Sequence, residues 1–374
     1  MGLRVALIGC GKIADGHAGE IAKLTELGKL VAVCDSEPLM AEQLATRFGV
    51  RGIYADLGEM LRREQPDVLH VTTPPASHLP LARQALAAGC HLYVEKPLAP
   101  THEDALTLLA EARRAGRKLT AGYSYLFDPP ARALRELVAS GALGELVHLE
   151  AFYGYDLAGP FGTAVMADAG HWVHGLPGQL LQNNLDHLLY KLAEYFEDDH
   201  PRLSAFGVRR RPQRFGDARD IMADELRLML CGERLTASAV FSSFTRPMTH
   251  TLRLYGTRNT AAVDFLARTL VLESTTPLPS ALGRLLPAFE RSWKLAREGL
   301  RNLAAFRRYE FHYFSGLNHL IAAFYRSILE NGDPPIPYRT LEWSSELMSR
   351  LWSELPRFES AVPSTPATAK GDLS

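Results

Sequence analysis

The chain has 374 residues, 47% of them hydrophobic and 22% charged, so it is long enough for two ordinary globular domains. Its 41 lysines and arginines nearly balance its 42 aspartates and glutamates, which gives no electrostatic reason to expect a nucleic acid partner. The four cysteines form no CxxC pair, which favours small buried side chains in a reducing compartment over a metal site. The N-terminus runs directly into a strand, with neither a signal peptide nor a membrane-spanning run, so we expect a cytoplasmic protein.

The first 125 residues alternate short apolar strands with helical patterns. The pattern predicts strands at 3–8, 29–34, 68–72, 91–94 and 118–122, and helices at 12–27, 38–48, 78–88 and 101–115. Such alternation is typical of an α/β domain with a doubly wound parallel sheet, which binds ligands at the carboxyl ends of its strands. We therefore assign residues 1–125 to a ligand-binding domain of the Rossmann type.

The pattern changes after Tyr125. Longer alternating strands are expected at 146–155, 203–210, 224–231, 235–244, 249–256 and 260–265, with helices at 129–140, 178–196, 311–330 and 339–355. Residues 126–360 are thus predicted to form an α+β domain with a large, mainly antiparallel open sheet, for substrate binding and oligomerisation. Since a partner subunit commonly covers an exposed sheet face, we expect a homo-oligomer. The tail 361–374, rich in small and polar residues, is expected to be disordered.

A glycine-rich turn follows the first strand and opens the first helix. Its sequence is Gly9-Cys10-Gly11-Lys12-Ile13-Ala14, a GxGxxA pattern in the context that gives the pattern meaning. Gly9 permits the tight turn and Gly11 allows the backbone to approach a pyrophosphate, which would lie on free N–H groups at the positive helix end. A plain strand-to-helix turn is the alternative, and the surrounding alternation of elements argues against it.

Asp35 ends the second strand, 24 residues after Gly11. A carboxylate there accepts hydrogen bonds from the adenosine ribose hydroxyls and repels a 2′-phosphate, which favours NAD over NADP. The simpler interpretation of Asp35 is a solvated residue at the end of a strand or a helix cap.

Three further segments carry a family resemblance. They are Thr73-Pro74-Pro75-Ala76-Ser77-His78, Glu95-Lys96-Pro97 and the run from Gly178 to His187. With the glycine motif, they resemble the Gfo/Idh/MocA family, the glucose–fructose oxidoreductase and inositol dehydrogenase group, over most of the chain. The resemblance implies a cis bond between Lys96 and Pro97. It also implies cofactor contacts from Gly9, Gly11, Lys12, Ile13, Asp35, Thr73, Pro74, Pro75, His78, Glu95 and Lys96.

The resemblance also implies catalytic positions. Lys96 matches the catalytic lysine that hydrogen-bonds the reacting hydroxyl or carbonyl, and His187 matches the second catalytic position. Asn183 lies four residues before His187 on the same helical face, where the family often has aspartate. Because asparagine does not titrate, Asn183 would hydrogen-bond substrate without relaying a proton. Asp186 lies about 100° around the helix from His187, so we expect only a minor role for it.

The resemblance implies reversible hydride transfer between a nicotinamide and a carbinol carbon of a sugar, sugar derivative or cyclitol. One alternative is a glycosidase-like or epimerase-like enzyme that recycles its NAD. Another is a non-catalytic NAD sensor. The presence of both Lys96 and His187 favours catalysis. Asn183 and Leu126, which stands where many relatives carry a basic residue, keep the sensor open.

Residues 282–306 carry an apolar stripe at helical spacing together with many basic residues. One interpretation is docking on a membrane surface. The other is packing on the sheet or on a neighbouring subunit, which we favour at this point because apolar stripes usually face a core.

Overall fold

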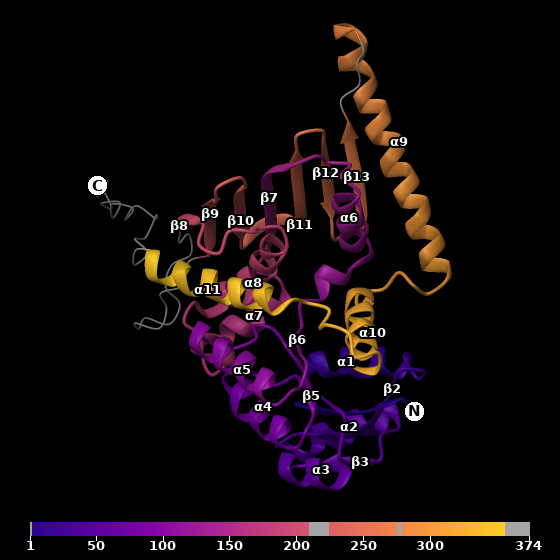
Figure 1. Ribbon diagram of the computed structural model, residues 1–374, viewed down its shortest axis with the longest axis vertical. Coiled ribbons are helices and arrows are strands. Elements are labelled where there is room, and N and C mark those ends of the chain that lie inside the picture. Colours follow the sequence, from indigo (N-terminus) through magenta and orange to yellow (C-terminus); the bar gives the residue numbers. More distant parts are fainter. Residues whose placement is uncertain (1, 209–223, 275–278, 356–374) are drawn as a thin grey trace, which may run out of the picture.

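The computed structural model describes residues 2–208, 224–274 and 279–355, and its first sheet lies in the lower half of Figure 1. The strand order is β3-β2-β1-β4-β5-β6, and every pairing between these strands is parallel. This order confirms the predicted Rossmann architecture. The strands are β1 (Leu3–Ile8), β2 (Gly28–Cys34), β3 (Gly52–Tyr54), β4 (Val68–Val71), β5 (His91–Val94) and β6 (Leu119–Ala121).

Helices flank this sheet and follow its strands along the chain. They are α1 (Lys12–Ala22), α2 (Pro38–Phe48), α3 (Leu57–Glu64), α4 (His78–Ala87) and α5 (His102–Arg114). Thr101 caps α5, because its hydroxyl oxygen accepts the Asp104 backbone N–H at 3.2 Å. Fully buried apolar strands such as β4 place one continuous core between the sheet and these helices.

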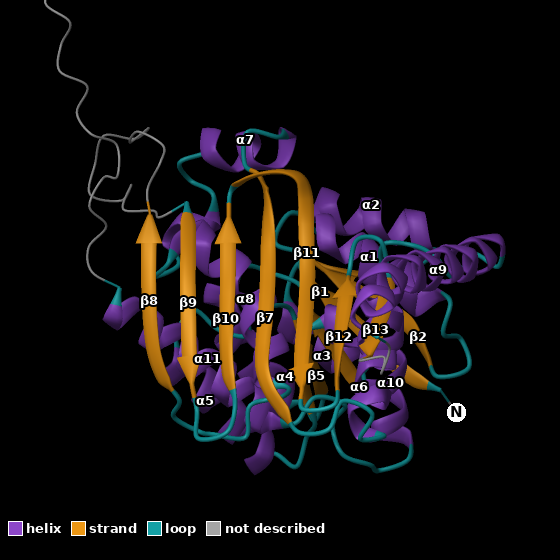
Figure 2. Cartoon of the chain, turned by 90° about the horizontal axis from the view of Figure 1, so that it is seen from above, coloured by secondary structure: helices purple, strands orange, loops and turns teal. Residues whose placement is uncertain are grey.

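The second sheet has the order β13-β12-β11-β7-β10-β9-β8, and Figure 2 shows its strands side by side. Among the described residues, five of its six pairings are antiparallel and one, between β7 and β10, is parallel. The mainly antiparallel sheet is therefore confirmed. Its strands are β7 (Leu146–Asp156), β8 (Arg202–Val208), β9 (Glu225–Cys231), β10 (Thr236–Ser242), β11 (Phe244–Gly256), β12 (Asn259–Asp264) and β13 (Thr269–Ser274).

One helix, α8 (Gln179–Ala193), covers the inner face of the second sheet. Most of its residues are buried, including the polar residues Gln182, Asp186 and Lys191. Tyr190 packs in the first core and Leu185 in the second, so α8 lies between the two halves of the molecule. Two shorter helices, α6 (Pro129–Ala139) and α7 (Pro160–Ala167), precede and follow β7 along the chain.

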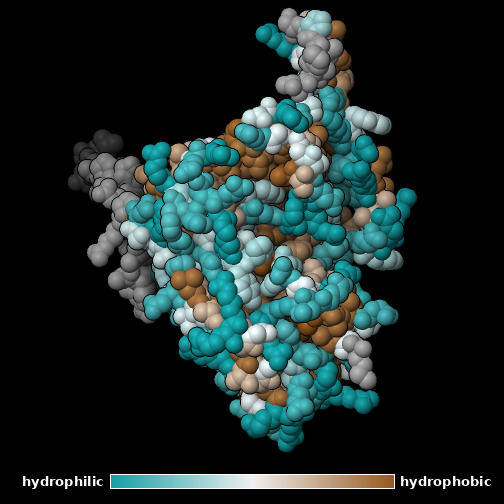
Figure 3. Space-filling model, in the orientation of Figure 1, coloured by the Kyte–Doolittle hydropathy of each residue, from teal (hydrophilic) through white to brown (hydrophobic). Residues whose placement is uncertain are grey.

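A long helix, α9 (Ser280–Arg307), follows β13 and projects at the upper right of Figure 1. Figure 3 shows hydrophobic residues along the outer edge of this rod. The helix contacts β13 and leaves most of its own circumference exposed.

The chain then returns to the first sheet through α10 (Ser315–Leu329). Leu320, Phe324 and Tyr325 of α10 are fully buried in the core of the Rossmann sheet. The first core is therefore completed by residues from near the C-terminus.

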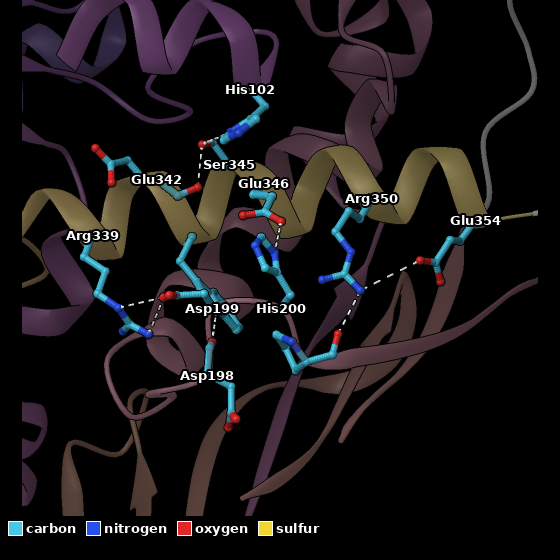
Figure 4. Close-up of polar contacts among 12 residues, drawn as sticks. His102, Asp198, Asp199, His200, Arg339, Glu342, Ser345, Glu346, Arg350 and Glu354 are labelled. Atoms are coloured by element: carbon cyan, nitrogen blue, oxygen red, sulfur yellow. Dashed lines mark hydrogen bonds and ion pairs between the residues drawn. The ribbon is translucent and has the colours of Figure 1, made fainter. Parts of the chain in front are cut away.

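The last described helix, α11 (Tyr338–Glu354), ties the two halves of the molecule together (Figure 4). On one side His102 Nδ1 lies 2.9 Å from the Ser345 hydroxyl, and on the other the Trp343 indole N–H donates to the Asp198 carbonyl at 2.9 Å. Ion pairs such as His200–Glu346, at 2.8 Å, add further contacts along the helix. Because α8 lies between the same two halves, α11 supports the helix that carries the predicted catalytic residues.

Several predicted bounds differ from the structure. The helix expected to reach residue 27 ends at Ala22, because successive turns from Ile21 to Leu27 lead the chain directly into β2. The strand expected at 249–256 begins at Phe244, beyond a register irregularity. The sequence pattern did not predict β3, α3, α7 or β13. The expected disordered tail and the last two residues of the strand expected at 203–210 lie outside the described residues, and the boundary at residue 125 stays a prediction.

Candidate active site

The glycine-rich turn between β1 and α1 is shaped for a ligand. Gly9 has φ of +92°, and a Cβ there would lie 2.6 Å from Thr73 Cγ2, so only glycine fits this position. A Cβ on Gly11 would meet no atom within 4 Å, so the space beside that backbone is open. No side chain caps α1, whose first N–H groups, including those of Lys12 and Ile13, lack intrahelical partners. These features fit a dinucleotide pyrophosphate at the helix end.

Asp35 lies at the end of β2, next to this turn. Its carboxylate accepts the Cys10 backbone N–H at 2.6 Å and the Glu37 backbone N–H at 2.9 Å. The carboxylate therefore fixes the turn and keeps an acidic group at the position expected for the ribose.

The segment after β4 forms the next part of the edge. Thr73 is partly buried and accepts the Ser77 hydroxyl at 2.7 Å, while Pro74 is exposed and Pro75 is buried. His78 is fully buried, with Nε2 2.9 Å from the Thr73 carbonyl and Nδ1 3.1 Å from the Leu98 carbonyl. Its ring holds the loop together, so the structure does not bring the His78 side chain to the open side of the edge.

Glu95 and Lys96 follow β5, and the Lys96–Pro97 peptide bond is cis, as the resemblance implied. The Glu95 carboxylate accepts the Lys96 backbone N–H at 3.0 Å and lies 2.9 Å from His17 Nε2. A Cβ at Gly122 would lie 2.5 Å from this carboxylate, so glycine there makes room for it. Glu95 is thus buried and acts on the backbone of Lys96.

Lys96 and α8 meet across the interface between the two halves of the molecule. The Lys96 ammonium donates to Asn183 Oδ1 at 2.8 Å and to the Asn183 carbonyl at 3.2 Å. One turn later on the same face, His187 lies with Nδ1 3.1 Å from the Tyr190 hydroxyl. Lys96 follows β5 of the first sheet, whereas Asn183 and His187 lie on α8. The structure therefore brings these three residues together from distant parts of the chain.

Two buried carboxylates affect the charge of Lys96. Burial lowers the pKa of Lys96, and Asp186 and then Glu95 oppose that shift. Burial raises the pKa of Asp186 to about 7, and the positive charge of Lys96 opposes this shift. Asp186 is fully buried and has the largest electrostatic effect of any carboxylate on Lys96. The structure therefore gives Asp186 more influence than its place around the helix suggested.

A second buried lysine lies beneath His187. Lys191 is hydrogen-bonded to His250 Nε2, and its amine lies 4.3 Å from the ring centroid of Phe265. Burial lowers the pKa of His187, and the positive charges of Lys96 and Lys191 lower it further. His187 is therefore held as the neutral imidazole.

The sequence reading named neither Lys191 nor His250. Lys191 continues the helical face of Asn183 and His187 by one more turn, which is a signal that the spacing offered. His250 comes from β11, and its approach to α8 depends on the tertiary fold. Tyr153 of β7 also faces this cluster, with its ring centroid 5.6 Å from that of His187.

Comparison with known proteins supports the interpretation of the N-terminal part of the chain. Residues 3–123 match the Gfo/Idh/MocA family model, described as an oxidoreductase family with an NAD-binding Rossmann fold, which confirms the resemblance over these residues. The chain is 40% identical over 145 residues to a D-glucoside 3-dehydrogenase of Escherichia coli K12, covering 38% of this chain and 41% of that protein. It is 29% identical over 178 residues to an inositol 2-dehydrogenase of Burkholderia cenocepacia, covering 47% and 53%. These matches span about half or less of either relative's length.

A solved structure extends the likeness in fold to the whole chain. The WlbA dehydrogenase of Bordetella pertussis, crystallised with NADH and UDP-GlcNAcA, superposes with a TM-score of 0.75. The superposition covers 94% of this chain and 95% of that one at 18% sequence identity. At this identity the likeness shows the two-domain fold alone.

Proposed function

We propose that this chain, whose residues 3–123 match the Gfo/Idh/MocA family model, is an NAD-dependent dehydrogenase acting on a carbinol carbon of a sugar, sugar derivative or cyclitol. The observation that carries the proposal is the meeting of Lys96 with Asn183 and His187 at the strand edge that also holds the glycine-rich turn. The matched dehydrogenases, named for a glucoside and for inositol, support the substrate class.

The residues that would hold the cofactor are those of the strand edge. Gly9 and Gly11 leave room for the pyrophosphate, and the Asp35 carboxylate would receive the ribose hydroxyls and disfavour a 2′-phosphate. The exposed Ile13 side chain offers an apolar surface beside the same turn. A nicotinamide bound there would supply the acceptor or donor for hydride.

Lys96 would handle the substrate proton. In the oxidation direction, its neutral amine accepts the proton of the reacting hydroxyl, and in the reduction direction its ammonium returns a proton to the carbonyl oxygen. Burial favours the neutral amine, while the Asp186 charge favours the ammonium, so the two effects act in opposite directions on one group. Asn183 fixes the direction in which the amine points through the 2.8 Å hydrogen bond.

His187 would position the substrate. Its Nδ1 is paired with the Tyr190 hydroxyl, which leaves Nε2 for a substrate hydroxyl. Because burial and the neighbouring cations keep the imidazole neutral, His187 would act at neutral pH as an uncharged hydrogen-bonding group.

The test is to incubate the purified protein with NAD+ and a panel of glycosides, nucleotide sugars and cyclitols, and to follow absorbance of the reduced nicotinamide. We expect NADH to accumulate with one substrate class, and the activity to be lost in Lys96→Ala. Lys29→Ala, which removes an exposed lysine at the start of β2, is the matched control and should keep full activity. Product without net NADH would indicate the NAD-recycling alternative. Bound NAD without turnover of any compound would indicate a sensor.

A further inference from the structure

The long helix α9 packs on the second sheet with its polar side. Lys294 donates to the Leu272 carbonyl of β13 at 2.7 Å, and Arg291 lies 3.6 Å from the Glu273 carboxylate. Nearer the C-terminal end, the Asn302 amide donates to the Ala267 carbonyl at 2.8 Å. This orientation is the reverse of the usual one, in which an amphipathic helix turns its apolar side toward the protein.

The apolar side of α9 consequently points away from the protein. Phe289, Trp293 and Leu300 are 66%, 69% and 63% exposed, values far outside those of core residues. The stripe repeats at steps of three, four and seven residues, so it runs along one line of the helix. Its exposed members are Leu282, Leu286, Phe289, Trp293, Leu300 and Leu303.

The helix also carries an excess of positive charge. Residues 282–308 contain seven lysines and arginines against two glutamates, whereas the whole chain has a net charge of −1. Arg297 lies one turn after Trp293, and Arg307 lies one turn after Leu303, so both cations adjoin the stripe. The structure gives neither of them an acidic partner among the described residues. A surface that complements this helix therefore offers an apolar layer to the stripe and negative charge to the arginines beside it.

We propose that α9 docks lengthwise on an anionic lipid membrane, with the stripe of Leu282 to Leu303 in the interfacial region and the arginines at the headgroups. A basic helix with an apolar face that includes tryptophan and phenylalanine has the composition of an interfacial helix. The projecting position of α9 leaves this face open to a flat surface (Figures 1 and 3). No helix in the described ranges is both long and apolar enough to span a bilayer, so the contact would be a surface one.

Charge disfavours a second copy of this chain as the partner. Pairing two α9 stripes would bring Arg297 and Arg307 of both copies close to one apolar seam, and like charges at short range repel. An anionic membrane supplies both the apolar layer and the compensating charge.

The experiment measures co-sedimentation of the full chain with vesicles of phosphatidylglycerol and phosphatidylcholine, and with vesicles of phosphatidylcholine alone. We expect binding to the anionic vesicles only, weakened by added salt. The double variant Phe289→Glu/Trp293→Glu should abolish binding, and Arg297→Gln/Arg307→Gln should weaken it by about fivefold for each arginine. In the otherwise unchanged chain, Trp293 fluorescence should shift to shorter wavelength on binding, and Trp293→Phe should remove that shift.

The matched control is Phe206→Glu/Met229→Glu, which places the same charges on exposed apolar residues of the second sheet and should bind like the parent chain. Failure of the parent chain to bind anionic vesicles would overturn the proposal, as would unchanged binding of the Phe289/Trp293 variant. A dimer that Phe289→Glu/Trp293→Glu dissociates, without vesicle binding by the parent chain, would show that a second copy covers the stripe. Neither outcome depends on dehydrogenase activity.

Discussion

Replacing Asn183 by alanine tests whether this residue positions the lysine. The change removes the Oδ1 acceptor 2.8 Å from the Lys96 ammonium and leaves only the longer bond to the Asn183 carbonyl. A hydrogen bond to a charged group contributes about 1.5–3 kcal/mol, and each 1.4 kcal/mol is a factor of ten. We therefore expect kcat/KM to fall by about 10- to 150-fold if that hydrogen bond is used in the transition state. The assay is NADH formation with the substrate that the panel identifies.

The same position offers its own comparison. Asn183→Asp keeps an acceptor oxygen and adds a negative charge, so activity should survive, and the acidic limb of the pH profile should move to higher pH because the ammonium of Lys96 is stabilised. The affinity for NAD+, measured by calorimetry, should be nearly unchanged in both variants, since Asn183 lies on α8 and outside the Rossmann sheet. A loss below threefold in Asn183→Ala, alongside complete inactivation by Lys96→Ala, would refute a positioning role for Asn183.

Three further predictions concern other parts of the fold. Gly9→Ala should cost about 1–3 kcal/mol of stability in urea unfolding through backbone strain and weaken NAD+ binding in calorimetry, because the new Cβ meets Thr73; unchanged NAD+ affinity would contradict the cofactor assignment. Burial lowers the pKa of His70 well below 6.5, so the unfolded chain binds a proton that the folded chain excludes, and stability is lost as the pH falls below 6.5. His70→Phe should remove up to about 1.4 kcal/mol per pH unit of this loss. If the free energy of urea unfolding fell equally in the two proteins between pH 6.5 and 5, this prediction would be contradicted. Phe324→Ala should cost about 3–5 kcal/mol in the same measurement, because the side chain is fully buried in the first core; a change below 1 kcal/mol would show that α10 contributes little.

The periodicity of the sequence predicted most elements of both sheets, because continuous apolar runs and alternating runs are local signals. It did not reveal β3, which has three residues and begins with Gly52, because so short a run carries little pattern. Nor could it tell in which direction α9 faces. Hydrophobic spacing establishes that a helix has an apolar side, whereas the side that meets the protein depends on contacts such as that of Lys294 with β13.

The candidate site divides in the same way. Lys96, Asn183 and His187 lie in recognisable motifs, and the structure brings them together. The other buried polar residues around them are paired with distant segments and carry no local signal. His250 lies 59 residues from Lys191, and Glu95 lies 78 residues from His17. A buried polar network of this kind becomes visible only when the tertiary fold has placed its members.

The return of α10 to the first sheet affects the order in which the protein can fold during its synthesis. The core beneath β1 and β4 closes only when Leu317 to Tyr325 arrive, almost 200 residues after the end of β6 at Ala121. At ribosomal rates of about 5–20 residues per second, this interval is on the order of 10–40 s. During that time α1, which opens at the glycine-rich turn, lacks α10, one of the helices that it packs against. A nascent chain would therefore gain a well-supported dinucleotide turn only after α10 has been synthesised, and a chain truncated before α10 would expose the apolar surface that this helix covers.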